Sequence, residues 1–166
     1  MAAEYEIERK FLVEFPDVSS LDACRTISIC QTYLLKTDED IQRRVRRLDI
    51  NGEVTYTYTE KRFLTPVTRE ENEFEIDKSE YENLLREADC ECVPIEKVRY
   101  CFEFKGQLFE LDTYPYSDSL AILEIELEST EQKICFPDYI NVIKEVTGDG
   151  RYSNAALASA GKFPEI

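Results

Sequence analysis

The sequence predicts a mainly β domain of the α+β class, either a barrel or a strongly curved sheet of about eight antiparallel strands with a few helices. Three observations lead to this prediction. Charged and apolar side chains alternate with a two-residue period in many segments. Tight-turn signals such as Asn51-Gly52 and Lys105-Gly106 separate neighbouring segments. The length of 166 residues fits one domain, residues 1–166, and no linker-like segment divides it.

The expected strands follow from this alternation and from the turns between them. Residues 31–36 and 41–48 are expected to form a hairpin across the sequence TDED. The Asn-Gly turn then leads into a strand that alternates Thr with Val or Tyr, and Lys-Gly joins two later strands. In chain order, the expected strands are residues 4–13, 31–36, 41–48, 54–62, 69–76, 96–104, 107–113 and 120–128.

Helical periodicity is weaker and predicts four short helices. Residues 78–88 carry apolar side chains at helical spacing after Ser79, the expected N-cap. One helix is expected around residues 21–27 (LDACRTI), and C-terminal helices are expected within residues 136–146 and 154–160. A barrel with apolar residues on its outer face needs a cover, so we expect a few helices packed outside it and at the C-terminus.

The composition excludes some classes of function. The formal net charge is −15, which argues against a nonspecific nucleic-acid binder, because such proteins need a basic field. No apolar run approaches the roughly 20 residues that span a bilayer, and the N-terminus has no apolar signal-peptide core. We therefore expect a cytoplasmic protein with no nucleic-acid or membrane partner. The sequence leaves a monomer and a homodimer both open.

The six cysteines and the absence of histidine narrow the chemistry further. A secreted disulfide scaffold would be shorter and denser in Cys, and Cys90-Glu91-Cys92 lacks the spacing of a zinc knuckle, so we expect buried, reduced thiols. Without histidine, the usual general base and the Ser-His and Cys-His nucleophile pairs are excluded. Any catalysis must use carboxylates, Lys, Arg, Tyr or a metal.

The alternation gives most expected strands one charged face, because residues i, i+2 and i+4 of a strand share a face. The simplest interpretation is a half-exposed sheet with a solvated charged face. The alternative is a barrel closed around a hydrated interior, where carboxylates would coordinate Mg²⁺ or Mn²⁺ and cations would hold phosphate. The charged faces carry Glu6, Glu8 and Lys10; Arg44 and Arg46; Lys61; Arg69, Glu71 and Glu73; Lys97, Arg99 and Glu103; Glu110 and Asp112; and Glu124, Glu126 and Glu128.

These charges also fall into ordered motifs. They are E-I-E-R-K at 6–10, R-V-R at 44–46, K-V-R at 97–99, E-L-D at 110–112 and E-I-E at 124–126, followed by EVTGDGRYSN at 145–154. In this order the motifs resemble those of the CYTH superfamily, the triphosphate tunnel metalloenzymes, over nearly the whole chain. The resemblance implies a closed eight-stranded antiparallel barrel that acts on a triphosphate compound with a divalent metal.

The resemblance also implies roles for individual acidic residues. The metal-binding carboxylates are expected to be Glu6, Glu8, Glu124 and Glu126, joined by Asp112. Glu71 and Glu73 correspond to an internal acidic strand, where they would orient the basic residues or bind a second metal.

The basic residues are expected to clamp phosphate, with Lys61 or Lys10 as the candidate general base. A one-residue slip of the strand at 54–62 would turn Glu60 and Arg62 inward in place of Lys61. Arg43 and Arg47 are expected at the surface. The sequence leaves open whether Tyr152 and Asn154 reach the tunnel mouth or pack and cap the last segment. The expected phosphate contacts are Lys10, Arg44, Arg46, Lys61, Lys97 and Arg99, with Lys144 and Arg151 at one mouth.

The chain is most similar to the short inorganic triphosphatases of this superfamily, which implies hydrolysis of tripolyphosphate to pyrophosphate and phosphate. Nucleoside or thiamine triphosphate hydrolysis, and class IV adenylate cyclase activity, are alternatives in the same tunnel. A cyclase would need a base-binding surface, for which Tyr33, Tyr56 and Tyr58 are the candidates. A noncatalytic polyphosphate-binding module is a third possibility, although pure anion binding does not require so many carboxylates.

Overall fold

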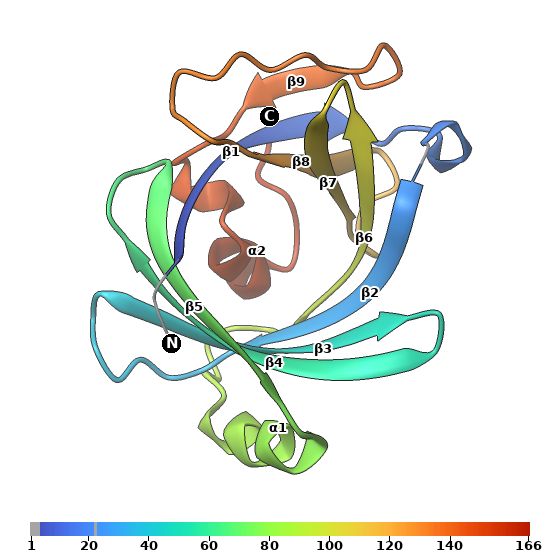
Figure 1. The fold of residues 1–166 in the computed structure, drawn as a ribbon. Coiled ribbons are helices and arrows are strands. Elements are labelled where there is room, and N and C mark those ends of the chain that lie inside the picture. Colours follow the sequence, from blue (N-terminus) through green and yellow to red (C-terminus); the bar gives the residue numbers. More distant parts are fainter. Residues whose placement is uncertain (1–3, 22) are drawn as a thin grey trace.

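The computed structural model describes residues 4–21 and 23–166 and shows a closed antiparallel barrel (Figure 1). The barrel strands are β1 (Glu4–Glu14), β2 (Ala23–Tyr33), β3 (Ile41–Ile50), β4 (Glu53–Phe63), β5 (Thr68–Ile76), β6 (Ile95–Phe104), β7 (Gln107–Thr113) and β8 (Leu120–Glu126). They hydrogen-bond in the order β5-β4-β3-β2-β6-β7-β8-β1, and β1 pairs back onto β5. This last pairing closes the barrel and confirms the predicted fold class.

One edge of β1 has two partners in succession. Residues 4–7 pair with β5, and Phe11–Val13 pair with the short outer strand β9 (Val142–Glu145). Between them, the Glu8 amide donates to the Val67 carbonyl and the Lys10 amide donates to Thr147 Oγ1. This edge of β1 therefore changes its partner from β5 to β9 across Glu8 and Lys10.

The two predicted tight turns are confirmed. Ile50 pairs with Glu53, so Asn51 and Gly52 alone form the β3–β4 turn, with φ of 54° and 87°. Positive φ at both positions is the geometry that an Asn-Gly hairpin turn requires. Lys105 and Gly106 connect β6 to β7 in the same way, with φ of 50° and 73°.

The helix expected near residues 21–27 is wrong. The described part of this segment enters β2, after the 3₁₀ turn η1 (Val18–Ser20), while residue 22 lies outside the described residues. Ile27 and Ile29 are both buried, and β2 pairs with β6 through this stretch. β-Branched side chains at two-residue spacing favour a strand, and pairing with a neighbouring strand overrides weak helical periodicity.

The helix expected at 136–146 is also wrong, because this segment contains β9 and an irregular stretch before it. Pro137 has no amide hydrogen to donate within a helix. The segment covers the apolar outer face of the barrel instead, where Phe136 and Ile140 pack with outward-facing Phe11 and Phe109. An irregular chain thus supplies cover that we expected from a helix.

The helix α1 (Lys78–Leu84), continued by η2 (Leu85–Glu87), confirms the prediction at 78–88. Its N-cap residue lies two positions before the predicted one. Asp77, not Ser79, is the N-cap: it accepts from the Glu80 amide at 2.8 Å while Glu80 accepts from the Asp77 amide. This capping box satisfies two amides that the first helical turn leaves free. α1 packs Tyr81 against Tyr56 on the outside of β4.

The predicted helix at 154–160 is confirmed as α2 (Asn154–Ala160), which follows the 3₁₀ turn η3 (Gly150–Tyr152). It lies within the ring of strands rather than outside it (Figure 1). Leu157 packs with inward-facing Leu12 and Ile122, and buried Tyr152 joins the same cluster. The inner face of the barrel therefore turns from charged to apolar where α2 fills one end.

Two further findings bear on the sequence predictions. No disulfide joins the described cysteines, but the expected burial is not found: Cys90 and Cys135 are exposed, and Cys30, Cys92 and Cys101 are only partly buried. The side chain of Cys24 lies outside the described residues. Both α-helices have only seven residues, and none of the described helices could cross a bilayer.

Candidate functional site

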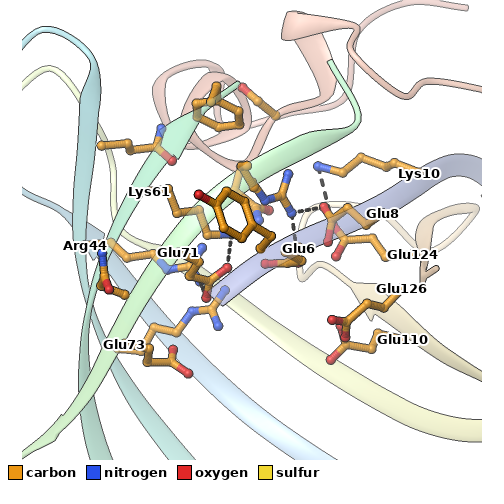
Figure 2. Close-up of a pocket in the computed structure, with 18 of the residues that line it drawn as sticks. Glu6, Glu8, Lys10, Arg44, Lys61, Glu71, Glu73, Glu110, Glu124 and Glu126 are labelled. Carbon is orange, nitrogen blue, oxygen red and sulfur yellow. Dashed lines mark hydrogen bonds and ion pairs between the residues drawn. The ribbon is translucent and has the colours of Figure 1, made fainter. Parts of the chain in front are cut away.

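The inward-facing charges enclose a cavity of about 450 Å³, here called the charged chamber (Figure 2). The chamber exists because alternation places every second residue of each strand inside, and closure brings these rows together. Charges of both signs dominate its lining. Among the described residues, they are Lys10, Arg44, Arg46, Lys61, Arg69 and Arg99, with Glu6, Glu8, Glu71, Glu73, Glu110, Glu124 and Glu126.

Nine of the residues that the sequence assigned to the site line the chamber, and four do not. The strand at 54–62 has the register that points Lys61 inward, so the alternative with Glu60 and Arg62 inside is wrong. The four side chains that the structure does not bring to the chamber lining are Lys97, Asp112, Lys144 and Arg151.

Asp112 is fully buried next to the chamber, where two cations hold it. Lys97 Nζ lies 2.8 Å from its Oδ2, and Arg99 binds both oxygens, with Nε at 2.7 Å and Nη2 at 2.9 Å. Burial opposes ionisation, but the charges of Arg99 and Lys97 hold the pKa of Asp112 well below its ordinary value. Burial lowers the pKa of Lys97 to about 7, against the attraction of Asp112. The carboxylate expected to bind metal instead fixes two basic side chains.

Lys144 and Arg151 lie outside the chamber near the C-terminal turn. Lys144 Nζ sits 5.2 Å from the ring centre of Tyr152. Arg151 is 60% exposed and pairs with Asp149 at 2.7 Å. The interpretation of these two residues as mouth contacts therefore lacks support from their placement.

Asn154 reaches the chamber from the first residue of α2, which decides between the two placements that the sequence left open. The cap of α2 is Ser153, whose hydroxyl accepts from the Ala156 amide. Asn154 Oδ1 accepts from Tyr114 Oη at 3.2 Å and from Lys97 Nζ at 3.5 Å. The helix that fills the barrel is thus connected to the buried Lys97–Asp112 pair.

Four carboxylates gather on one side of the chamber, from the adjacent strands β1, β8 and β7. Glu8 is opposite Glu126, and Glu110 is opposite Glu124, in the strand pairing. Burial and the charges of Glu124 and Glu8 raise the pKa of Glu110, against the opposing charge of Arg99. Such crowding of acidic oxygens indicates a place where an added cation would be stabilised.

On the other side of the chamber, basic side chains surround Glu71 of β5 (Figure 2). Arg44 and Lys61 approach its carboxylate at 3.8 and 3.5 Å. Burial, together with the charges of Arg44 and Arg69, lowers the pKa of Lys61 to about 7. Arg44 Nε is buried and has no hydrogen-bond partner. Glu71 Oε2 also lacks a hydrogen-bond partner, so the ion pairs on this side leave both a donor and an acceptor unsatisfied.

Arg46 continues the basic side deeper into the barrel. Its Nε donates to Gln31 at 2.6 Å, and Gln31 in turn donates to Tyr33 Oη. Burial and the charges of Arg44 and Arg99 lower the pKa of Arg46 to about 10. Arg43 faces outward as predicted, but it is buried: it bonds Tyr58 at 2.9 Å and the Leu35 carbonyl at 3.0 Å.

The sequence prediction assigned no site role to Arg69 and Glu110, although it placed both on charged faces. Arg69 shares its face with Glu71, and Glu110 precedes Asp112 by two residues. Both line the chamber. The alternation could have identified them, but only barrel closure shows that Arg69 lies against β1.

A second hollow of about 390 Å³ opens beside the chamber, where β1 passes from β5 to β9. This side hollow shares Glu8, Lys10 and Arg69 with the chamber. Residues 63–66 and 146–150 form its other walls. The chamber therefore continues sideways through the gap in the barrel wall.

Comparison with known proteins gives consistent matches. The profile of the CYTH domain family matches residues 4–138. A protein of Acetivibrio thermocellus named inorganic triphosphatase is 37% identical over 153 residues, which cover 92% of both chains. One of Nitrosomonas europaea with the same name is 34% identical and covers 92% of this chain and 96% of its own. The crystal structure of the inorganic triphosphatase NE1496 superposes with a TM-score of 0.59 at 32% identity, covering 96% of this chain and 97% of that one.

Proposed function

The chain belongs to the CYTH domain family, and we propose that it is a triphosphatase that hydrolyses inorganic tripolyphosphate to pyrophosphate and phosphate. The observation that carries this proposal is the charged chamber itself, where clustered Arg and Lys side chains share one cavity with clustered carboxylates inside the barrel. The two relatives named inorganic triphosphatase support the same substrate.

The basic side suits a polyanion. Arg44, Arg46 and Lys61 are buried close together, and their mutual repulsion contributes to the lowered pKa values of Arg46 and Lys61. A triphosphate would relieve that repulsion more fully than a monophosphate, because it carries more negative charge over a greater length. Arginine can bind phosphate oxygens through two donors at once, which also orients the chain of phosphates.

The carboxylate side suits a hard divalent cation, since its donors are all oxygen. No three acidic side chains among the described residues surround a common point as they stand. Mg²⁺ or Mn²⁺ would be held by Glu8, Glu124 and Glu126, with Glu6 and Glu110 at the margin, and by phosphate oxygens. The chemistry of such an ion here is to neutralise phosphate charge and to lower the pKa of a bound water.

Lys61 is the best candidate for the general base. Its lowered pKa of about 7 leaves a substantial neutral fraction at neutral pH, and its side chain lines the chamber. Neutral Nζ would accept a proton from the attacking water as the water oxygen bonds to the terminal phosphorus. The bond from that phosphorus to the bridging oxygen then breaks, and pyrophosphate leaves. Lys10 is less suited, because its Nζ lies 3.4 Å from Glu124.

Inorganic tripolyphosphate is favoured over a nucleotide because none of the three candidate tyrosines is free to stack on a base. Tyr56 packs on Tyr81 of α1, and Tyr58 bonds Arg43 on the outer side, so neither is available to stack on a base. Tyr33 lines the chamber but is held by Gln31. A cytoplasmic location, the absence of nucleic-acid and membrane partners, and a monomeric or homodimeric state stay predictions from the sequence.

The test incubates the protein with tripolyphosphate, ATP or thiamine triphosphate, each with Mg²⁺ or Mn²⁺. The release of phosphate, pyrophosphate and cyclic AMP is measured. We expect phosphate to be released from tripolyphosphate far faster than from ATP. Cyclic AMP and pyrophosphate from ATP would indicate a cyclase instead. Tight binding without turnover would indicate a binding module. Glu8→Gln should remove metal-dependent turnover while the barrel stays folded.

A further inference from the structure

Arg69 bridges two carboxylates of β1, Glu6 and Glu8. It lies opposite Glu6 in the β1–β5 pairing, and its Nη2 contacts both Glu6 Oε1, at 3.1 Å, and Glu8 Oε1. The side chains of Arg69 and Glu8 are 13% and 8% exposed. Burial lowers the pKa of Arg69, but the charges of Glu8 and Glu6 outweigh it and raise that pKa. One guanidinium nitrogen thus contacts two carboxylates that face the chamber, and its single positive charge balances only half of theirs.

One donor of this guanidinium is left unsatisfied. Arg69 Nε is buried and has no hydrogen-bond partner. The guanidinium carbon lies 5.8 Å from the ring centre of Phe63, and the side chain lines both the charged chamber and the side hollow. An unsatisfied buried donor costs free energy, so a ligand that offers an acceptor at this position gains what the unbound protein lacks.

We propose that Arg69 competes with the divalent cation for Glu6 and Glu8, and that it turns to the triphosphate when both ligands are bound. This inference rests on the proposed function of the same chamber. A monovalent guanidinium and a divalent ion cannot both occupy the two Oε1 atoms that contact Nη2. When the metal takes them, Arg69 loses its two partners while its charge stays within the chamber. Phosphate oxygens then become its acceptors.

The competition makes binding of the two ligands interdependent. Without triphosphate, the metal must displace Arg69 and leave a buried cation unpaired, which weakens metal binding. Triphosphate supplies the new partner for Arg69 and so strengthens metal binding. By linkage, the metal strengthens triphosphate binding by the same factor. Removing Arg69 should therefore tighten metal binding in the protein without triphosphate, a gain that a purely structural residue would not produce.

The experiment measures Mn²⁺ binding by titration calorimetry, with and without diimidotriphosphate, a tripolyphosphate whose bridging oxygens are replaced by NH. The variant is Arg69→Gln, and the matched control is Arg62→Gln, which makes the same change of charge on an exposed residue of β4. Thermal melting verifies folding. If Arg69→Gln is not folded, Arg69→Met removes the charge and adds no polar group that burial would penalise.

We expect Arg69→Gln to bind Mn²⁺ alone on the order of fivefold more tightly than the wild type and Arg62→Gln. It should bind the analogue alone more weakly, and the enhancement of Mn²⁺ binding by the analogue should shrink. Mn²⁺ affinity that is unchanged or lower in Arg69→Gln would overturn the proposed competition. The proposed function would still stand in that case if the wild type hydrolyses tripolyphosphate. A wild type that neither binds Mn²⁺ nor hydrolyses tripolyphosphate would overturn both.

Discussion

Lys97 and Asp112 form an ion pair sealed from solvent, with 2.8 Å between Nζ and Oδ2 and no exposed side-chain surface on either residue. The pair joins β6 to β7 next to the charged chamber, and Arg99 extends from it into the chamber. Asp112 therefore acts on the site through the basic residues that it holds.

Replacing Asp112 with Asn should destabilise the fold strongly. The change leaves Lys97 and Arg99 buried without their shared counter-charge, and breaking a buried pair in this way costs about 3–5 kcal/mol. Urea unfolding measures the loss. The control is Glu82→Gln, which removes the exposed pair with Lys78 on α1 and should cost no more than about 0.5 kcal/mol. Equal losses of unfolding free energy in Asp112→Asn and Glu82→Gln would contradict the prediction that the buried pair stabilises the fold more than the exposed one.

The activity of the wild type should fall as pH drops below about 7, because Lys61, whose pKa is about 7, becomes protonated and can no longer accept a proton. The dependence of kcat/KM on pH reports this group in the free enzyme. Lys61→Arg keeps the charge and should lose most activity along with this acid limb. Lys144→Met, outside the chamber, should keep the wild-type profile. An unchanged acid limb in Lys61→Arg would exclude Lys61 as the base.

Lys61 should also make stability depend on pH. Its pKa is lowered from 10.5 to about 7 on folding, so between these values the unfolded chain binds more protons and the folded state gains stability as pH rises. The slope from this group is at most about 1.4 kcal/mol per pH unit. Lys61→Met removes it. We therefore expect the stability advantage of Lys61→Met to be largest below pH 7 and to shrink towards pH 10.5.

The unfolding free energies of the wild type and Lys61→Met are compared at each pH. Other groups, including Lys97 with its similarly lowered pKa, contribute to both and cancel. An advantage that grows with pH would have the wrong sign for a buried lysine.

Gly148→Ala should destabilise the protein more than Gly52→Ala. Both glycines have positive φ, at 74° and 87°, which an alanine adopts at a cost of about 1–2 kcal/mol. A Cβ at Gly148 would also lie 2.9 Å from Pro66 Cβ across the side hollow, whereas one at Gly52 meets nothing within 4 Å. Thermal or urea unfolding of both variants isolates the added contact. Equal losses would show that residues 146–150 move away from Pro66 at little cost.

Much of the site follows from one local rule. The two-residue period of a strand places Glu6, Glu8 and Lys10 on one face, whatever the strand pairs with. The same rule applies to Arg44 and Arg46, and the Asn-Gly turn sets the register that carries Lys61 inward. The helices at 21–27 and 136–146 were predicted wrongly, because short apolar runs do not distinguish a helix from a strand or a covering segment without its neighbours.

The sequence by itself determined which side chains share a face, because alternation is a property of the extended backbone alone. Only the tertiary structure decided which charges meet. Arg69 bridges Glu6 and Glu8 across more than sixty positions because barrel closure lays β5 against β1. Burial also decides: Asp112 follows the same alternation as Glu110, yet it is fully buried between Lys97 and Arg99 and does not line the chamber. Strand pairing and burial are nonlocal, and they separate residues that the sequence pattern makes equivalent.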